Sequence, residues 1–171
     1  AAVCGYEPEF IKIENMAVGS SLTLENPPNK KYKGESSHAL INGMGGTINY
    51  QDKSWQGFEA EDLIAIIDLG SAKTINAVEV RFLQSQVFWI FLPYHIQIEH
   101  SSDGKNFELI YEDFPSNNFS FEQKIISYKA NLGPLESRFI RVKGYNIDQC
   151  PDYHPGAGGP SWIFSDEIII N

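Results

Sequence analysis

The feature that most constrains this chain is a series of short apolar runs, each closed by a turn. Leu63 to Leu69 (LIAIIDL) ends at Gly70, and Ala77 to Leu83 (AVEVRFL) alternates apolar with polar residues. Tyr94 to Ser101 alternates in the same way, and Phe107 to Tyr111 follows as the return strand of a hairpin. Alternation with a period of two indicates strands with one buried face. Since no long amphipathic helix pattern occurs, the sequence predicts an all-β sandwich or barrel.

Further strands are expected towards both ends of the chain. They are Phe10–Ile13, Ser20–Leu24, Lys124–Leu132, Phe139–Val142 and Ile168–Ile170. Gly133–Pro134 should end one of these strands, and Ala72 to Asn76 should form a turn. Ser36 to Ile41 favours a single helical turn with a serine cap.

Two long irregular stretches interrupt the strands. Asn146 to Ser161 is rich in Pro, Gly and Asp, and Asn42 to Phe58 is rich in Gly with aromatic residues embedded in it. Loops of this length inside a compact domain are usually functional or disordered. Prolines and aromatic residues favour order, so we expect a β scaffold with a site at one end.

Size and charge exclude several classes of protein. A chain of 171 residues with 42% hydrophobic and 13% aromatic residues fits one folded domain. A net charge of −9 disfavours nucleic acid and anionic lipid, and suits neutral ligands and divalent cations. The longest apolar run, Val87 to Leu92, is far too short to be a transmembrane segment. Because neither an initiator Met nor a signal peptide opens the chain, we expect a mature chain or a domain cut from a longer one.

The two cysteines, Cys4 and Cys150, form no CxxC pair, which disfavours a structural zinc site. They could pair in an oxidising compartment or remain two free thiols, and the sequence leaves both readings open.

No catalytic frame is evident. Asp166 and Glu167 are adjacent, so on a strand they point to opposite faces and do not form a glycosidase acid–base pair. Neither a nucleophile elbow nor a phosphate-binding loop occurs. The run from Gly156 to Gly159 (GAGG) follows no strand–turn–helix pattern, so it is interpreted as loop shape.

Five short motifs in a fixed order resemble the discoidin, or coagulation-factor type C, domain. They are Ala39–Gly43 with Trp55, Ile67–Gly70, Ser101–Phe107, Ser137–Val142 and Asp166–Ile168. The same galactose-binding-like jelly roll recurs in bacterial carbohydrate-binding modules. The resemblance implies an all-β, galactose-binding-like jelly-roll β-sandwich over residues 18–171, preceded by a lead-in or linker over residues 1–17.

A closer likeness comes from the segments WQGF, WIFLP and HPGAGGPSWIFSDEI. They look like the C-terminal module of secreted, chitobiase-like β-N-acetylhexosaminidases of gut Bacteroidetes. The chain has no room for that enzyme's catalytic barrel, which takes about 250 residues. The likeness therefore implies an excised, non-catalytic accessory module that is secreted, periplasmic or on the cell surface.

The resemblance also implies one structural calcium ion. By position its ligands would be Asn42, Thr47 and Glu167, and calcium prefers oxygen ligands of these kinds. Asn42 stands where the family usually has Asp, which removes one negative charge from the site. The alternative for Glu167 is a residue hydrogen-bonded to loop backbone.

The family binds sugars with loops at one end of the sandwich, where aromatic rings stack on the sugar and polar groups read its hydroxyls. The candidates in this chain are Tyr50, Trp55, Gln86, Phe88, Trp89, His154 and Trp162, with Asn49, Asp52, Gln56 and Tyr153 near them. Core packing is the alternative for Trp55, Trp162 and Trp89. For His154 the alternative is a hydrogen-bonded loop residue.

The predicted function is therefore a carbohydrate-binding accessory module that targets a tethered glycoside hydrolase to galactose- or N-acetylhexosamine-containing glycans. One alternative is a structural domain that packs on the catalytic domain and binds no ligand. Another is a discoidin-type domain that binds protein or lipid through Phe88 to Leu92, although no basic cluster accompanies that segment. An enzyme in its own right is the third alternative.

Overall fold

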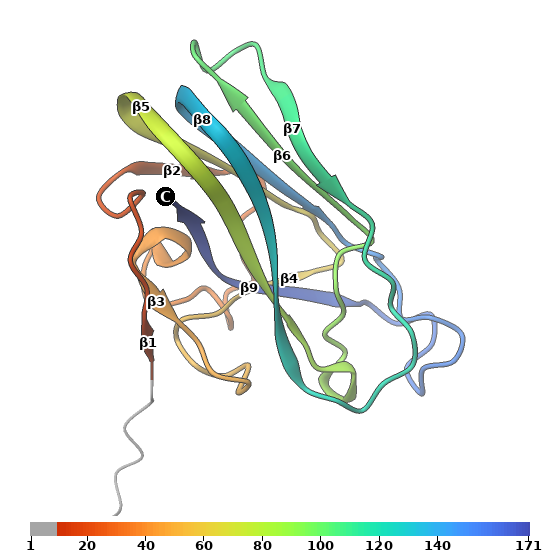
Figure 1. Ribbon diagram of the computed structural model, residues 1–171. Helices are drawn as coiled ribbons and strands as arrows, with labels where there is room; N and C mark the ends of the chain where they lie inside the picture. The colour runs from red at the N-terminus through yellow and green to blue at the C-terminus, as the bar shows by residue number, and fades with distance from the viewer. Residues whose placement is uncertain (1–9) are drawn as a thin grey trace, which may run out of the picture.

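The structure, a computed structural model, describes residues 10–171, and its regular secondary structure is almost entirely β-strand (Figure 1). The elements are β1 (Ile11–Lys12), β2 (Ser21–Leu24), the 3-10 helix η1 (Ala39–Ile41), β3 (Met44–Gly45), β4 (Gln56–Glu59), β5 (Leu63–Gln84), the 3-10 helix η2 (Gln86–Phe88), β6 (His95–Ser101), β7 (Glu108–Asp113), β8 (Lys124–Tyr145) and β9 (Trp162–Ile170). Within the described residues no helix is long and apolar enough to cross a membrane.

Two long antiparallel strands, β5 and β8, run through both layers of the sandwich (Figure 1). In one layer, the first part of β5 pairs with β2 and with the end of β8, which continues to β6 and β7. In the other layer, the second part of β5 pairs with β9, which continues to β4. All of these pairs are antiparallel. The predicted all-β, galactose-binding-like β-sandwich is confirmed.

The expected interruptions of β5 and β8 were wrong. The predicted turn at Ala72–Asn76 lies inside β5, and the predicted break at Gly133–Pro134 lies inside β8. The ladder between the two strands shifts register between Ile75 and Ala77, where the partner changes from Leu135 to Asn131. A β-bulge of this kind leaves residues without a ladder partner, so a proline is tolerated within the strand.

The helical turn is shorter than predicted and lacks the expected serine cap. Its cap position is His38, which makes no side-chain capping bond. The hydroxyl of Ser36 instead accepts a hydrogen bond from the His38 amide at 3.2 Å.

The main core lies between the two layers, where the inward residues of each strand meet. It includes Ile67 and Val80 of β5, Ile98 of β6, Ile140 of β8 and Ile168 of β9, all fully buried. A second cluster of Trp55, Leu83, Ile90 and Phe164 lies under the loops, with Tyr32, Tyr50, Ile125 and Trp162 packed on it. This second cluster fixes the position of the candidate site.

The chain already packs on the sandwich before Val18, where the domain was expected to begin. Ala17 is fully buried, and the amide of Met16 donates to the carbonyl of Ile170 at 2.9 Å. The side chain of Asn15 donates to the carbonyl of Ile168 at 2.7 Å. Residues 1–9, and with them Cys4 and its suggested pairing with Cys150, lie outside the described residues.

Candidate functional site

A hollow of about 460 Å³ lies where three separate segments meet. The lining residues are Ile48, Asn49, Tyr50, Gln51, Phe88 and Gln123. The first four follow β3, Phe88 ends η2, and Gln123 immediately precedes β8. The hollow therefore combines two aromatic rings with three amide side chains.

The two aromatic side chains form one wall of this hollow. The ring centroids of Tyr50 and Phe88 are 4.6 Å apart, with the ring planes inclined by 45°. Tyr50 is held from below by Phe164 at 6.0 Å and by Tyr32 at 5.7 Å. Phe88 is 47% exposed. The pair thus presents an anchored apolar surface of the kind that packs on the face of a sugar ring.

Local hydrogen bonds hold the amide side of the hollow in place. The side-chain oxygen of Asn49 accepts a bond from the amide of Gln51 at 3.0 Å, and the Asn49 amide donates to the Thr47 hydroxyl at 3.2 Å. Amide groups can both donate to and accept from sugar hydroxyls. The lining contains no Asp, Glu, Lys, Arg or His, so this hollow suits an uncharged, hydroxyl-rich ligand.

Trp55 is buried, so it offers no stacking surface, in contrast to its prediction as a ligand residue. It is 1% exposed, and its indole N–H donates to the carbonyl of Thr47 at 2.8 Å. Gly46 lies against the indole so closely that an added Cβ would be 2.5 Å from its Nε1. Trp55 therefore supports the loop that carries Tyr50 instead of contacting a sugar.

Gln86 and His154 are also buried, and they hold the surrounding loops by hydrogen bonds to backbone carbonyls. Gln86 is 3% exposed, and its side-chain amide donates to the carbonyl of Asn118 at 2.8 Å. Nδ1 of His154 accepts from the amide of Gly156 at 3.0 Å, so the proton lies on Nε2, which donates to the carbonyl of Gln86 at 2.7 Å. Because both side chains are buried and already have hydrogen-bond partners, the structure does not bring them to the hollow that Tyr50 and Phe88 line.

Trp89 is partly exposed, at 37%, but much of its indole covers the glycine loop. A Cβ at Gly156 or Gly159 would lie 2.5 or 2.6 Å from the indole ring. Its edge also meets His154, with centroids 5.9 Å apart. The GAGG run is therefore shaped by contact with Trp89, which lies outside the Tyr50–Phe88 hollow.

The remaining aromatic candidates lie elsewhere. Trp162 is half-buried and packs edge-on against Tyr32 at 5.3 Å. Tyr153 is 40% exposed, and its hydroxyl donates to the carbonyl of Asn117 at 2.8 Å. Of the predicted ligand residues, the structure brings together Tyr50, Phe88 and Asn49.

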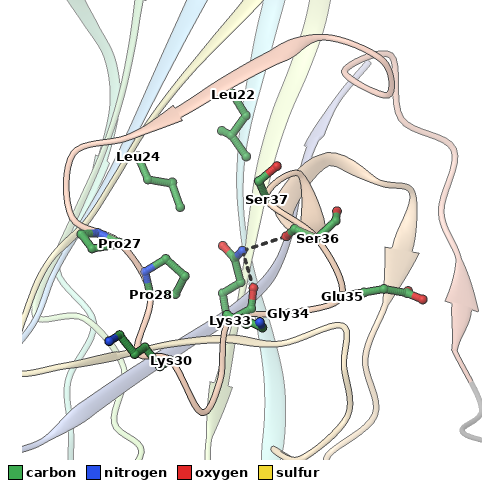
Figure 2. Close-up of a pocket in the computed structure, with 11 residues that line it drawn as sticks. Leu22, Leu24, Pro27, Pro28, Lys30, Lys33, Gly34, Glu35, Ser36 and Ser37 are labelled. Carbon is green, nitrogen blue, oxygen red and sulfur yellow. Dashed lines mark hydrogen bonds between the residues drawn. The ribbon is translucent and has the colours of Figure 1, made fainter.

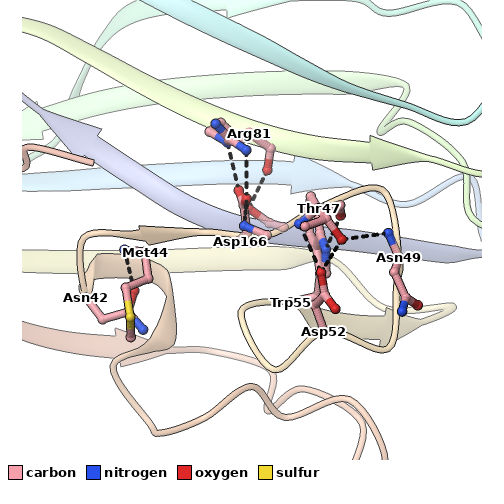
Figure 3. Close-up of polar contacts among 10 residues, drawn as sticks. Asn42, Met44, Thr47, Asn49, Asp52, Trp55, Arg81 and Asp166 are labelled. Carbon is pink, nitrogen blue, oxygen red and sulfur yellow. Dashed lines mark hydrogen bonds and ion pairs between the residues drawn. The ribbon is translucent and has the colours of Figure 1, made fainter. Parts of the chain in front are cut away.

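The three predicted calcium ligands are held in different ways. Asn42 accepts a bond from the amide of Met44 at 3.0 Å, whereas Thr47 donates its hydroxyl to Asp52 (Figure 3). Glu167 is fully buried; its Oε1 accepts from Asn15 at 3.1 Å, and its Oε2 has no partner within residues 10–171. Burial raises the pKa of Glu167 to about 8, although Asn15 opposes this rise. An orphaned, buried carboxylate oxygen fits a cation.

The surroundings of Glu167 limit the kind of cation site. The segment that follows Asn42 lies against β9, because the amide of Gly46 donates to Asp166, the residue before Glu167, at 2.7 Å. No group of three or more Asp, Glu, His or Cys side chains within the described chain could hold a metal ion. A cation here would depend mainly on amide and backbone oxygens, which calcium accepts.

Next to Glu167 lies a buried ion pair that the sequence did not predict. Arg81 on β5 contacts Asp166 on β9 at 3.0 Å, and Asp166 also accepts the amide of Gly46 at 2.7 Å (Figure 3). Arg81 lies at a polar position of an alternating strand, so the period-two pattern alone would place its side chain in solvent. Its partner is distant in sequence, so no local signal reveals the pair.

Comparison with solved structures shows which known folds this protein resembles. The protein resembles the module CpGH89CBM32-6 of Clostridium perfringens, with a TM-score of 0.56, 18% identity, and coverage of 92% of this chain and 98% of that one. It resembles chitosan-binding module 1 from a chitosanase/glucanase of Paenibacillus sp. IK-5, with a TM-score of 0.58, 13% identity, and coverage of 92% and 98%. It also resembles a fucose-binding module of Streptococcus pneumoniae, with a TM-score of 0.56, 12% identity, and coverage of 92% of this chain and 94% of that one.

These likenesses establish the galactose-binding-like sandwich as the class of fold, in agreement with the resemblance of the sequence motifs. No protein-family model matches the sequence. Nor does any curated protein match it.

Gln51 and Gln123 of the hollow were not singled out from the sequence. Gln51 stands beside Tyr50 and could have been included with that loop. Gln123 closes a polar stretch, and only the start of β8 brings it to the hollow.

Proposed function

We propose that this protein is a non-catalytic carbohydrate-binding module. The observation that carries the proposal is the hollow in which Tyr50 and Phe88, 4.6 Å apart, face the amides of Asn49, Gln51 and Gln123. An apolar wall with a few polar groups is the usual composition of a site that orients a small ligand. The structural neighbours described as chitosan-binding and fucose-binding modules support this proposal.

In the proposed mechanism a sugar ring stacks on Phe88 and Tyr50, and the amides bind its hydroxyl groups. A shallow site of this kind gives weak affinity for one sugar. Tethering to a glycoside hydrolase would convert weak binding into a high local concentration of enzyme at the glycan. A secreted β-N-acetylhexosaminidase is the proposed partner, on the basis of the sequence likeness, and galactose or N-acetylhexosamine is the proposed sugar.

A glycan array with galactose, N-acetylgalactosamine, N-acetylglucosamine and chitooligosaccharides tests the proposal. Specific binding that is lost in Phe88→Ala and retained in Phe114→Ala supports it. Phe114 is a suitable control because it is 62% exposed and stacks on His95, outside the hollow. A folded protein that binds no glycan on the array would contradict the proposal.

Calcium is proposed as a structural ligand at Glu167, with oxygens of the Asn42 and Thr47 segment as further ligands. The support is the buried Oε2 of Glu167, which has no partner in the described chain. The ion would neutralise a buried carboxylate and join β9 to the loop after η1. It would have no part in sugar chemistry.

A second function, docking against the catalytic domain, is favoured by a separate observation. Val87, Phe119, Phe121 and Tyr153 are 50%, 52%, 72% and 40% exposed. Phe119 contacts both Phe121 and Tyr153, with centroids at 4.7 and 5.7 Å, and Val87 lines one hollow with Phe119 and Phe121, so these side chains form one apolar patch. Exposed patches of this kind often mark interaction sites. If the patch docks, the two-domain protein will show hydrogen-exchange protection there that the isolated module lacks.

A further inference from the structure

A second hollow, of about 480 Å³, lies beside the Tyr50–Phe88 hollow and shares Gln51 with it. Its walls are residues 30–35 and 51–53, and Trp55 completes the lining. Tyr32 of this hollow and Tyr50 of the first are in edge contact, with centroids 5.7 Å apart. The two hollows are therefore neighbours on one surface. Each has the volume of an ordinary small-ligand site.

Four lysines line this second hollow: Lys30, Lys31, Lys33 and Lys53. All four are exposed, and within residues 10–171 none lies within ion-pair distance of a carboxylate. The arginines, Lys124 and Lys143 are paired with acidic residues, whereas in the described part of the chain Lys12, Lys73, Lys105 and Lys129 are not, so the distinguishing feature of the hollow is that four such lysines line one place. The lysine hollow thus holds cationic groups that the fold leaves without partners.

The charge of the lysine hollow is opposite to that of the whole protein. The lining holds four lysines and two carboxylates, Glu35 and Asp52, so its local charge is +2, whereas the chain carries −9. Asp52 is further occupied by Thr47, whose amide donates to it at 3.1 Å. Figure 2, a close-up of the adjoining pocket that Leu22 and Leu24 line, shows Lys30, Lys33 and Glu35 along the segment that follows Pro28. An anion would be attracted to this place and repelled by the rest of the surface.

We infer that the lysine hollow is an extension of the sugar site and that the preferred ligand is an anionic glycan. A neutral ring would stack on Tyr50 and Phe88, while a carboxylate or sulfate on the neighbouring unit would lie among the lysines. Lysine ammonium groups suit such anions because they are mobile point charges with three donors each. This inference rests on the proposed carbohydrate-binding function and names its class of ligand.

Matched pairs of oligosaccharides test the inference by isothermal titration. The pairs are oligogalacturonate with its methyl ester, a sulfated with a desulfated galactan oligosaccharide, and a sialylated with an asialo lactosamine. We expect at least one acidic member to bind about tenfold more tightly than its neutral counterpart, and the advantage to shrink as salt rises from 50 to 500 mM. The three pairs distinguish uronate, sulfate and sialate as the source of the anion.

Two variants that each lose three positive charges show which lysines cause the preference for the acidic ligand. The triple variant Lys30→Gln, Lys33→Gln, Lys53→Gln should lose the preference for the acidic ligand. The control triple Lys73→Gln, Lys105→Gln, Lys129→Gln removes the same charge from exposed lysines outside the lysine hollow and should keep the preference. Both triples should unfold at the temperature of the parent, because these side chains are exposed.

The outcomes separate this inference from the proposed function. Equal binding of both members in every pair, lost in Phe88→Ala, would overturn the anionic preference and leave the carbohydrate-binding function standing. Binding of inorganic polyphosphate as tight as that of the acidic glycan would also overturn it, because charge alone would then suffice. No binding of any glycan would overturn both.

Discussion

Arg81 and Asp166 form a buried ion pair, with the guanidinium 3.0 Å from a carboxylate that has no exposed surface. Burial raises the pKa of Asp166 to about 6, and the charge of Arg81 opposes this rise. Asp166 also accepts the amide of Gly46, at the start of the loop that carries Tyr50. The pair therefore connects β5, β9 and the sugar-site loop.

Arg81→Met should destabilise the fold strongly, because it leaves Asp166 buried without its cation. A loss of about 3–5 kcal/mol in the free energy of unfolding is expected, measured by urea denaturation. Arg138→Met is the control: its pair with Asp68 is partly exposed, with the arginine side chain 41% accessible, so the loss should stay below about 1 kcal/mol. Equal losses of unfolding free energy in the two variants would mean that the buried pair stabilises the fold no more than the exposed pair does.

Gly156→Ala should destabilise the long loop, because the new methyl group would lie 2.5 Å from the indole of Trp89. Overpacking of this kind costs about 1–3 kcal/mol. Gly133→Ala has open space around it and should be neutral. Thermal unfolding followed by circular dichroism checks both. In the Trp89→Ala background the same substitution should cost less, since the obstructing ring is gone; an equal cost there would mean that the contact with Trp89 is not the cause.

Local patterns were enough to predict an all-β sandwich or barrel, because the period-two alternation in β5 and β6 reports which residues face the core, and the motif resemblance then selected the sandwich. They did not reveal that β5 passes through Ala72–Asn76 without a turn, since a bulge depends on the partner strand. Aromatic candidates were recognised by type, but exposure separates Phe88 from Trp55, and exposure is a tertiary property. The lysine hollow likewise depends on the approach of residues 30–33 to Lys53.

Calcium should raise the unfolding temperature, and a chelator such as EGTA should lower it to the value of the metal-free protein. Binding to the folded state alone stabilises by mass action, with about 2.7 kcal/mol expected at a hundred times the dissociation constant. Glu167→Gln removes the buried carboxylate and should abolish the calcium response. Glu136→Gln, at an exposed position, should keep it. A parent protein that unfolds at the same temperature with calcium and with EGTA would contradict the proposed calcium site.

Acid should weaken the hairpin between β6 and β7 through Asp103. Its carboxylate accepts the amides of Asn106 and Lys105, each at 2.8 Å, and these bonds hold its pKa well below the ordinary value. Because the folded-state pKa is depressed, the stabilisation is complete above the unfolded value of about 3.9 and is lost as pH falls through the folded value. Asp103→Asn should therefore flatten the decline in unfolding free energy below pH 4, measured by urea titration from pH 2 to 7. If the free energy of unfolding falls below pH 4 as steeply in Asp103→Asn as in the parent, other carboxylates cause the decline.

Phe88→Ala and Tyr50→Ala should both weaken glycan binding, but they should differ in their effect on stability. Phe88 is 47% exposed, so its loss should remove the apolar surface on which the sugar stacks and leave the unfolding temperature nearly unchanged. Tyr50 also contacts Phe164 and Tyr32 of the second cluster, so its removal should lower the unfolding temperature as well. Titration calorimetry with the best glycan and thermal unfolding separate the two effects. If Phe88→Ala binds as tightly as the parent, the stacking surface lies elsewhere, and Trp89→Ala becomes the decisive variant because that indole is the other partly exposed ring of the same segment.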